Sequence, residues 1–511
     1  MSESNALDRL VEVADRHFCP YHLPHSAKTQ GETYGRSTPT LIPNRKENWS
    51  SADIEVFNND ILERIETALK NGTHCDLSGV VFPGSFSCAD RALPEIDFSH
   101  CRFERGNVDF SGAEFSGNTA SFSSAVFSCV DVSFKDTLFT SKRAEFYETV
   151  FRCLDVWFAG ADFSDCYAAF SGSNFDCNHV DFLGASFTGG DNFQRTKFSG
   201  TSTSFSNSQF TGGDFSLAEF GSDETYFDRA EFLDGYPTFE NAKFFGHKVD
   251  FSNSAFCTTV SFAASPRKKA DIRELAFGEL NFNNANFASR VSFSNRVFLA
   301  ATSFKNTGFA RAPEFHGCEL HQNTAFPSIG SFRDTSYKGA ATAYRTLRLA
   351  MKQQEAHEEE AMFWALEQIS KRNDLECNPL NNWKNLFNWI PWSLSAVYAL
   401  LSNYGLSINR PLVALTVWLF GATPIFYFCL RSNVDKLFGS TTYSDLLGFS
   451  IAQSLRPFFI WGDYNGSGIR SVLGENVNVL SVKLFATADS LISLVLIALL
   501  ILAVRRRFRM Q

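Results

Sequence analysis

The sequence has 511 residues, of which 20% are charged, 44% are hydrophobic and 55 are phenylalanine. This composition excludes a disordered polyampholyte, and a mean hydropathy of −0.13 excludes a protein made mostly of membrane spans. A net charge of −9 argues against phosphate-backbone binding as the main task, because that task needs a dense Lys and Arg surface. We therefore expect no nucleic-acid partner.

The twelve cysteines stand singly along the chain, without a Cys-x-x-Cys pair. This usage indicates thiols that serve as small apolar residues in a reducing compartment, rather than a disulfide framework. The first thirty residues contain no basic segment followed by an apolar one, which is the pattern of a secretory signal. We therefore expect the N-terminal region to lie in the cytosol.

Residues 1–80 lack the repeat of the later chain and are predicted to form an N-terminal cap. Apolar residues at helical spacing over 58–72 predict a helix that ends at Gly72. A zinc site is a weaker alternative for this region, since its spacings complete no four-ligand pattern. The residues concerned are His17, Cys19, His22, His25, His74 and Cys75. Packing or loop roles are favoured for them, and no metal or cofactor is predicted.

From residue 98 onward, phenylalanine recurs with spacings that alternate between five and seven residues. The residue two positions before each Phe is small or β-branched, so both positions face the same way on an extended segment. A helix or a hairpin sheet does not fit steps of five, whereas a helically wound sheet does. The register drifts over 187–232, and beyond Phe277 the spacing becomes five and six. The side chains predicted to form an inward core stack are Phe110, Phe115, Phe122, Phe127, Phe134, Phe139, Phe146, Phe151, Phe158, Phe163, Phe170, Phe175, Phe182 and Phe187.

The runs FSGAEF at 110–115, FSGSNF at 170–175 and FLGASF at 182–187 resemble the pentapeptide-repeat family, in its Phe-centred branch. The resemblance implies a mainly β chain, with a right-handed quadrilateral β-helix that we assign to residues 81–335. About nine to eleven turns are expected, stacked at the spacing of neighbouring strands. Mild acidity of this rod opens the alternative of a DNA mimic that binds topoisomerases, but the charge is weak and a solvated scaffold surface is favoured.

Residues 336–409 are predicted to form a helical and interfacial linker. Gly and Pro vanish over 340–372 and helix formers replace them, which predicts a helix or a helix pair. The acidic residues at 355–360 are interpreted as a solvated helix face, with partner docking as the alternative. The aromatic-rich segment at 381–405 suits the interface between water and lipid.

Residues 410–511 are predicted to form a two-span membrane hairpin with a 53-residue loop. The apolar segments 411–430 and 484–504 are each long enough to cross a bilayer. Four arginines follow the second segment and orient the C-terminus toward the cytoplasm: Arg505, Arg506, Arg507 and Arg509. Two spans would return the N-terminal domain to the same side, in agreement with the missing signal.

The helix and spans also resemble a C-terminal module of bacterial membrane-tethered pentapeptide-repeat proteins. The matching residues are Ala361, Phe363, Glu367, Tyr404 and Gly405. The resemblance implies a multi-pass protein of the bacterial inner membrane, with the β-helix and the C-terminus in the cytoplasm. It brings no settled biochemical activity.

Two functions remain open at this stage. The favoured one is a non-enzymatic scaffold, anchored in the lipid bilayer, whose rod docks an unidentified protein partner or forms a homo-oligomer; no P-loop, GxSxG or HExxH motif indicates an enzyme. The alternative is a subunit of an oligomeric pore or channel-like assembly, with the β-helix as its sensing or gating domain. Its pore-lining candidates are Trp461, Gly462, Asp463 and Asp489. Potassium selectivity is not expected, since the segment lacks Thr-Val-Gly and its second Gly, and Asp489 also lies close enough to the end of its span to be hydrated there.

Overall fold

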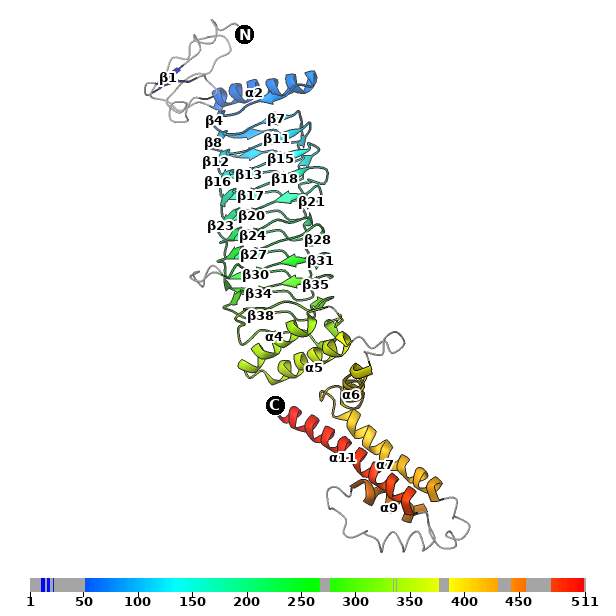
Figure 1. Ribbon diagram of the computed structural model, residues 1–511. Coiled ribbons are helices and arrows are strands. Elements are labelled where there is room, and N and C mark those ends of the chain that lie inside the picture. The colour runs from blue at the N-terminus through cyan, green and yellow to red at the C-terminus, as the bar shows by residue number, and fades with distance from the viewer. Residues whose placement is uncertain are drawn as a thin grey trace. The chain divides into compact units, whose positions relative to one another are not determined.

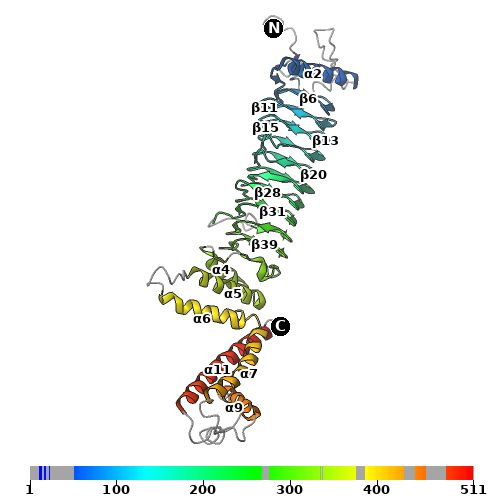
Figure 2. The same ribbon diagram turned by 90° about the vertical axis from the view of Figure 1, so that its right-hand side faces the viewer.

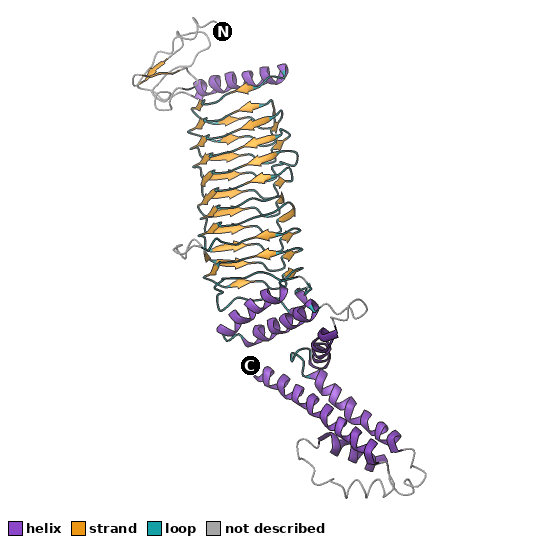
Figure 3. Ribbon diagram, viewed as in Figure 1, coloured by secondary structure: helices purple, strands orange, loops and turns teal. Residues whose placement is uncertain are grey.

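The computed structural model describes residues 11–13, 16–18, 22, 51–266, 276–333, 335–336, 338–375, 386–430, 443–455 and 479–509. The chain divides into two compact units, Met1–Asp334 and Thr335–Gln511. The first unit is a parallel β-solenoid and the second consists of helices (Figure 3). Each unit is described by itself below.

Strands of the solenoid pair in parallel with a strand three or four positions later in the chain, one turn further on, and so form four faces (Figure 1). The longest continuous sheet has ten strands, which corresponds to about nine turns. This is the helically wound sheet that the phenylalanine spacing predicts, and it is consistent with pentapeptide repeats. The hand of the winding stays a prediction.

The strands of the solenoid are short and fall on the faces as follows. Face 1 contains β3 (Cys75–Asp76), β7 (Ile96–Asp97), β11 (Thr119–Ser121), β15 (Arg143–Glu145), β18 (Tyr167–Ala169), β22 (Asp191–Asn192), β32 (Val260–Ser261) and β36 (Val291–Ser292). Face 2 contains β4 (Val81–Phe82), β8 (Arg102–Phe103), β12 (Val126–Phe127), β16 (Val150–Phe151), β19 (Asn174–Asp176), β23 (Lys197–Ser199), β26 (Glu219–Phe220), β29 (Lys243–Phe244), β33 (Ala276–Phe277) and β37 (Val297–Phe298). Face 3 contains β5 (Phe86–Ser87), β9 (Val108–Asp109), β13 (Asp131–Ser133), β17 (Asp155–Trp157), β20 (His179–Asp181), β24 (Ser202–Ser204), β27 (Glu224–Tyr226), β30 (Lys248–Asp250), β34 (Glu279–Asn281) and β38 (Thr302–Ser303). Face 4 contains β6 (Ala92–Leu93), β10 (Glu114–Phe115), β14 (Leu138–Phe139), β21 (Ser186–Phe187), β25 (Gln209–Thr211), β28 (Glu231–Asp234), β31 (Ala255–Phe256), β35 (Asn286–Phe287) and β39 (Gly308–Phe309).

The core of the solenoid is a set of stacked phenylalanine columns. All fourteen phenylalanines named above are at most 1% exposed. Within a column the rings lie nearly parallel, as for Phe122 and Phe146, whose centroids are 4.9 Å apart at 5°. Neighbouring columns meet edge to face, as for Phe134 and Phe146 at 5.5 Å and 87°. Both geometries are favourable for aromatic pairs, so every turn is held by its neighbours.

The inward position two residues before each Phe also accepts a hydroxyl, because the hydroxyl finds a partner inside the tube. Thr149 Oγ1 donates to the carbonyl of Phe122 at 2.8 Å, and Thr196 Oγ1 donates to that of Phe170 at 2.8 Å. A buried hydroxyl with a partner avoids the desolvation cost of an unpaired one. The preference for small residues at this position therefore includes Ser and Thr.

The drift of the repeat over 187–232 reflects a shorter turn. Stacked phenylalanines are 24 residues apart from Phe146 to Phe170, 23 from Phe170 to Phe193 and 22 from Phe193 to Phe215. The change coincides with Asp191, which occupies the inward position of β22 and accepts hydrogen bonds from the backbone N–H groups of Gly213 (3.0 Å) and Asp214 (3.2 Å). Burial raises the pKa of Asp191 to about 8.

Asp191 predicts a pH-dependent stability. Because the folded pKa of about 8 lies above the unfolded value of about 3.9, the folded state holds the proton over this window, and its contribution to stability falls as pH rises from about 4 to about 8. Asp191→Asn removes the titrating group but leaves an amide nitrogen that cannot accept one of the two backbone N–H bonds, so its stability relative to the parent chain should be higher at pH 9 than at pH 5. Urea unfolding at both pH values measures this. An equal stability difference at the two pH values would contradict it.

The repeat is interrupted more strongly at residues 263–276. The stacked rings of Phe251 and Phe282 are 31 residues apart in the sequence. The basic cluster at 267–269 lies outside the described residues. Arg296, two residues before Phe298, is fully buried beside this step. Its guanidinium donates to three backbone carbonyls. Nε donates to Phe262 (2.5 Å), Nη1 to Ala242 (2.7 Å) and Nη2 to Phe239 (3.1 Å). Arg296 thus occupies an inward position and joins three backbone carbonyls inside the solenoid.

Helix α2 (Ser51–Asn71) covers the first turns of the solenoid (Figure 2). Its buried side chains include Phe57, Ile61 and Ile65, and the ring of Phe57 meets that of Phe82 edge-on at 5.9 Å. The helix begins seven residues before the predicted start at 58. An open solenoid end exposes apolar rings, so an amphipathic helix over Phe82 acts as a cap. Strands β1 (Val11–Val13) and β2 (Arg16–Phe18) precede it as an antiparallel pair.

The second unit contains six α-helices in the described residues. They are α4 (Ala340–Gln353), α5 (His357–Asp374), α6 (Leu386–Ser402), α7 (Asn409–Leu430), α9 (Tyr443–Leu455) and α11 (Val479–Arg509). A 3-10 helix, η3 (Ile329–Ser331), ends the first unit. Helices α4 and α5 pack against each other, and α7, α9 and α11 pack together (Figure 1).

Two membrane spans are predicted, and the described helices support one of them by length and composition. Leu484–Arg506 of α11 is long and apolar enough to cross a membrane, with a mean hydropathy of 2.5. The segment 411–430 does form a helix, α7, but the same criterion finds no second span among the described residues.

Candidate functional site

The predicted pore-lining residues Trp461, Gly462 and Asp463 lie outside the described residues. Asp489 lies in α11, where it is fully buried. Trp418 of α7 donates its indole N–H to Asp489 Oδ1 at 2.8 Å. Ser454 of α9 has its hydroxyl 3.0 Å from Oδ1 and 2.9 Å from Oδ2. The carboxyl group is therefore the point at which three helices meet.

More buried polar side chains surround this point. Ser490 of α11 donates its hydroxyl to the carbonyl of Gln453 at 2.9 Å, beside the contact between Ser454 and Asp489. Ser450, Gln453 and Ser493 are at most 2% exposed, and their side-chain oxygens have no hydrogen-bond partner. We call Ser450, Gln453, Ser454, Asp489 and Ser493 the polar cluster. Sequence reasoning singled out only Asp489; the spacing of Ser450 and Ser454, one helical turn apart, was the available signal for the others.

The surface of these helices is apolar where their interior is polar. The exposed large apolar side chains of α7 and α11 are Leu412, Val413, Val417, Phe420, Ile425, Leu484, Leu491, Ile492, Leu494, Val495, Ile501 and Leu502. A water-soluble bundle has the opposite distribution, and exposed apolar surface of this extent marks contact with lipid or another protein.

Of the four arginines predicted to orient the C-terminus, Arg506 makes specific contacts with other parts of the second unit. Arg506 Nη1 donates to the carbonyl of Tyr404 at 2.5 Å, and its guanidinium lies 4.4 Å from the centre of the Trp364 ring. Gly405 has φ +82°, a conformation that glycine adopts readily. A Cβ at this position would lie 2.7 Å from Arg506 Nη1, so glycine leaves room for the arginine side chain. Arg505 is exposed. Arg507 and Arg509 lie in α11, and their side chains are outside the described structure.

Of the other residues of the predicted module, Ala361 is half-buried. Phe363 is fully buried and Glu367 is 1% exposed. Glu367 pairs with Arg348 of α4 at 2.8 Å and with Lys371 at 2.5 Å, so it joins α4 to α5. These contacts give the module a structural role.

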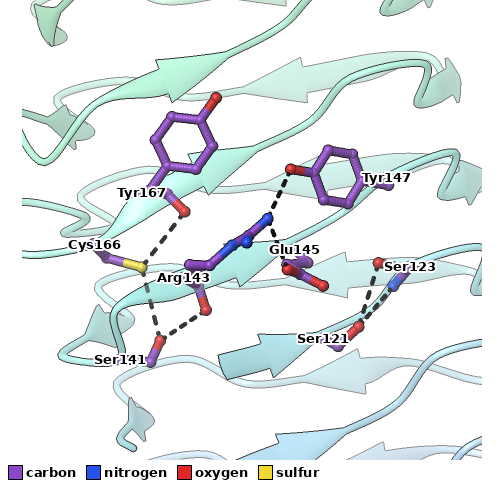
Figure 4. Close-up of polar contacts among 8 residues, drawn as sticks. All are labelled: Ser121, Ser123, Ser141, Arg143, Glu145, Tyr147, Cys166 and Tyr167. Atoms are coloured by element: carbon purple, nitrogen blue, oxygen red, sulfur yellow. Dashed lines mark hydrogen bonds and ion pairs between the residues drawn. The ribbon is translucent and has the colours of Figure 1, made fainter. Parts of the chain in front are cut away.

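The surface of the solenoid carries polar contacts that are satisfied locally. Figure 4 shows Arg143 of β15, whose guanidinium donates to the hydroxyl of Tyr147 at 3.1 Å and pairs with Glu145 at 3.0 Å. Below them, Ser141 Oγ donates to the carbonyl of Arg143 at 3.2 Å. These polar side chains of face 1 are therefore partnered by residues of the solenoid itself.

The zinc alternative finds no support in the described residues, where no group of three His, Cys, Asp or Glu side chains is placed to hold a metal. His22 Nε2 lies 2.9 Å from the carbonyl of Ser78, and Cys75 is buried. Cys19 and His25 lie outside the described residues, as does the side chain of His17.

The nine described cysteines are all free thiols, and seven are buried. Burial raises the pKa of Cys88 to about 12. The raised pKa keeps the Cys88 thiol protonated and unreactive at neutral pH, as expected for a cysteine used as an apolar residue.

Comparison with protein-family models, curated proteins and solved structures finds no match to this chain. Its function is therefore inferred from the contacts described above.

Proposed function

We propose that this protein is a non-enzymatic scaffold, anchored in a membrane by its C-terminal helices, whose solenoid presents flat polar faces to a protein partner or to a second copy. The observation that carries the proposal is the distribution of side chains in the second unit, with polar ones inside and apolar ones on the surface. Its polar side chains, such as Asp489 and Ser454, are buried, while Val417 and Leu491 are exposed to more than half of their area. Lipid is the solvent in which this arrangement is stable.

The proposal includes a second span, α7, and an orientation. Contacts between Tyr404 and Arg506 at one end, and between Phe426 and Phe485 at the other, show that α7 and α11 run antiparallel. Arg410, Arg505 and Arg506 consequently lie at the same end of the pair. Positive residues favour the cytoplasmic side, so this end, and the solenoid that precedes α7, are assigned to the cytoplasm of a bacterial cell.

Helix α6 fits the membrane interface in this proposal. It exposes Trp389, Trp392 and Leu394, and its last turn leads to the Tyr404 contact with Arg506. Tryptophan is enriched where lipid headgroups meet water. The helix would thus lie along the cytoplasmic surface.

The contacts of Asp489 favour an anchor over an oligomeric pore. A pore-lining carboxylate faces water, whereas Trp418 and Ser454 of the same chain cover this one. In this proposal the Asp489 carboxyl group links α7, α9 and α11 of one chain through these hydrogen bonds.

Membrane anchoring predicts a definite fractionation. The full chain should remain in the membrane pellet after alkaline carbonate extraction. At least half of the double variant Leu491→Lys, Val495→Lys should instead appear in the supernatant. Each lysine near the middle of a span opposes insertion by about 2.5 to 3.5 kcal/mol. The matched control is Leu154→Lys, Leu299→Lys on the solenoid, two leucines of similar exposure, which should stay in the pellet. Extraction of the parent chain by carbonate would refute the anchor.

A further inference from the structure

The polar cluster has an unbalanced charge. Asp489 is fully buried, and its hydrogen-bond partners, Trp418 and Ser454, are both neutral. No ion pair to Asp489 exists among the described residues. An isolated ionised carboxylate in an apolar bundle is strongly unfavourable, so it must take up either a proton or a cation.

The register of two helices places additional oxygens near this charge. Ser454 contacts Asp489 while Gln453 contacts Ser490, so α9 and α11 run antiparallel where they cross. The same register puts Ser450 opposite Ser493, one helical turn away on each helix. Both hydroxyls are fully buried and have no partner, and neither has Gln453 Oε1.

We propose that the polar cluster binds a small monovalent cation, with sodium as the representative ion. The donors are all oxygens, from the carboxylate of Asp489, three serine hydroxyls and the Gln453 amide, and oxygen is the ligand that hard cations prefer. One carboxylate balances one positive charge. A proton would neutralise Asp489 but leave the other three oxygens unpaired, whereas a cation satisfies both requirements.

Such an ion would lock α9 to α11 next to the Trp418 contact with α7. The inference does not depend on the scaffold function or on bilayer insertion, since the ligands come from one chain. Loss of carbonate resistance and loss of cation binding are therefore separate outcomes.

The test is thermal unfolding of the full chain in detergent at pH 8, with sodium chloride replacing choline chloride at constant ionic strength. Helical circular dichroism reports mainly on the second unit, since α2 is the one long helix described in the first. We expect sodium to raise Tm by about 5 °C, as ligand binding to the folded state does. Asp489→Asn should abolish the shift, and Ser370→Ala, which removes another buried unpaired hydroxyl on α5, should retain it.

The double variant Ser450→Ala, Ser493→Ala keeps the charge and removes two ligands, so it tests the proposal even if Asp489→Asn fails to fold. It should need about tenfold more sodium for half of the Tm shift. A Tm that ignores sodium but rises on acidification from pH 8 to pH 5 would show that Asp489 holds a proton and would overturn the proposal. A Tm independent of both would overturn it as well.

Discussion

Phe170→Ala is expected to lower the free energy of unfolding of the solenoid by about 3 to 5 kcal/mol, the range for removing a large aromatic side chain from a core. The ring is fully buried and stacks on Phe146 at 4.6 Å and on Phe193 at 4.8 Å. It also meets Phe158 and Phe182 edge-on. The parallel strands fix the backbone on both sides, so the cavity cannot close by local collapse.

Equilibrium unfolding in denaturant measures this loss, and the matched control is Leu154→Ala on the outside of the same solenoid. Leu154 is 53% exposed, so its truncation should change stability by no more than about 0.5 kcal/mol. Because turns contact only their neighbours, the Phe170 variant is also expected to broaden the transition. A loss under about 1 kcal/mol would mean that the ring is not part of a tight stack.

Arg296→Ala is expected to destabilise the solenoid by about 3 to 5 kcal/mol, because it removes the donors of three buried carbonyls and leaves a cavity. Burial lowers the pKa of Arg296 to about 10, yet the side chain stays charged at neutral pH. Its guanidinium also lies 5.0 Å from the centre of the Phe277 ring. Phe277 is tilted by 40° against Phe244, so the ordinary stack is interrupted at this point.

The same unfolding measurement applies, with Arg152→Ala as the control, since Arg152 is exposed. Arg296→Met separates the two parts of the cost. It keeps most of the volume and removes the donors, so it should lie between the parent chain and Arg296→Ala. An Arg296→Ala variant as stable as the parent chain would show that the arginine does not bridge these turns.

The solenoid could be predicted from sequence because its rule is local. A Phe and the small residue two positions earlier face inward wherever they occur, and corners recur at fixed offsets, as at Asp136 and Asn207, both with positive φ. Arg296 occupies one of the inward positions normally filled by a small residue. Nothing beside it in the sequence indicates the three buried carbonyls, of Phe239, Ala242 and Phe262, that accept its hydrogen bonds.

The candidate site was predictable only in part, for a different reason. A carboxylate in an apolar run is visible in the sequence, and this drew attention to Asp489. Its partners, Trp418 and Ser454, stand 71 and 35 residues away on two other helices. The contact between Arg506 and Tyr404 likewise joins residues 102 positions apart. Such pairings depend on helix packing, which local patterns do not determine.

The measurement that tests the scaffold account most directly is ion flux across liposomes that contain the full chain, with insertion verified by flotation. The account predicts flux no greater than in protein-free liposomes, for the parent chain and for Asp489→Ala alike, because the carboxyl group is enclosed by helices of its own chain. Flux from the inserted parent chain that disappears in Asp489→Ala would contradict the scaffold and establish the pore.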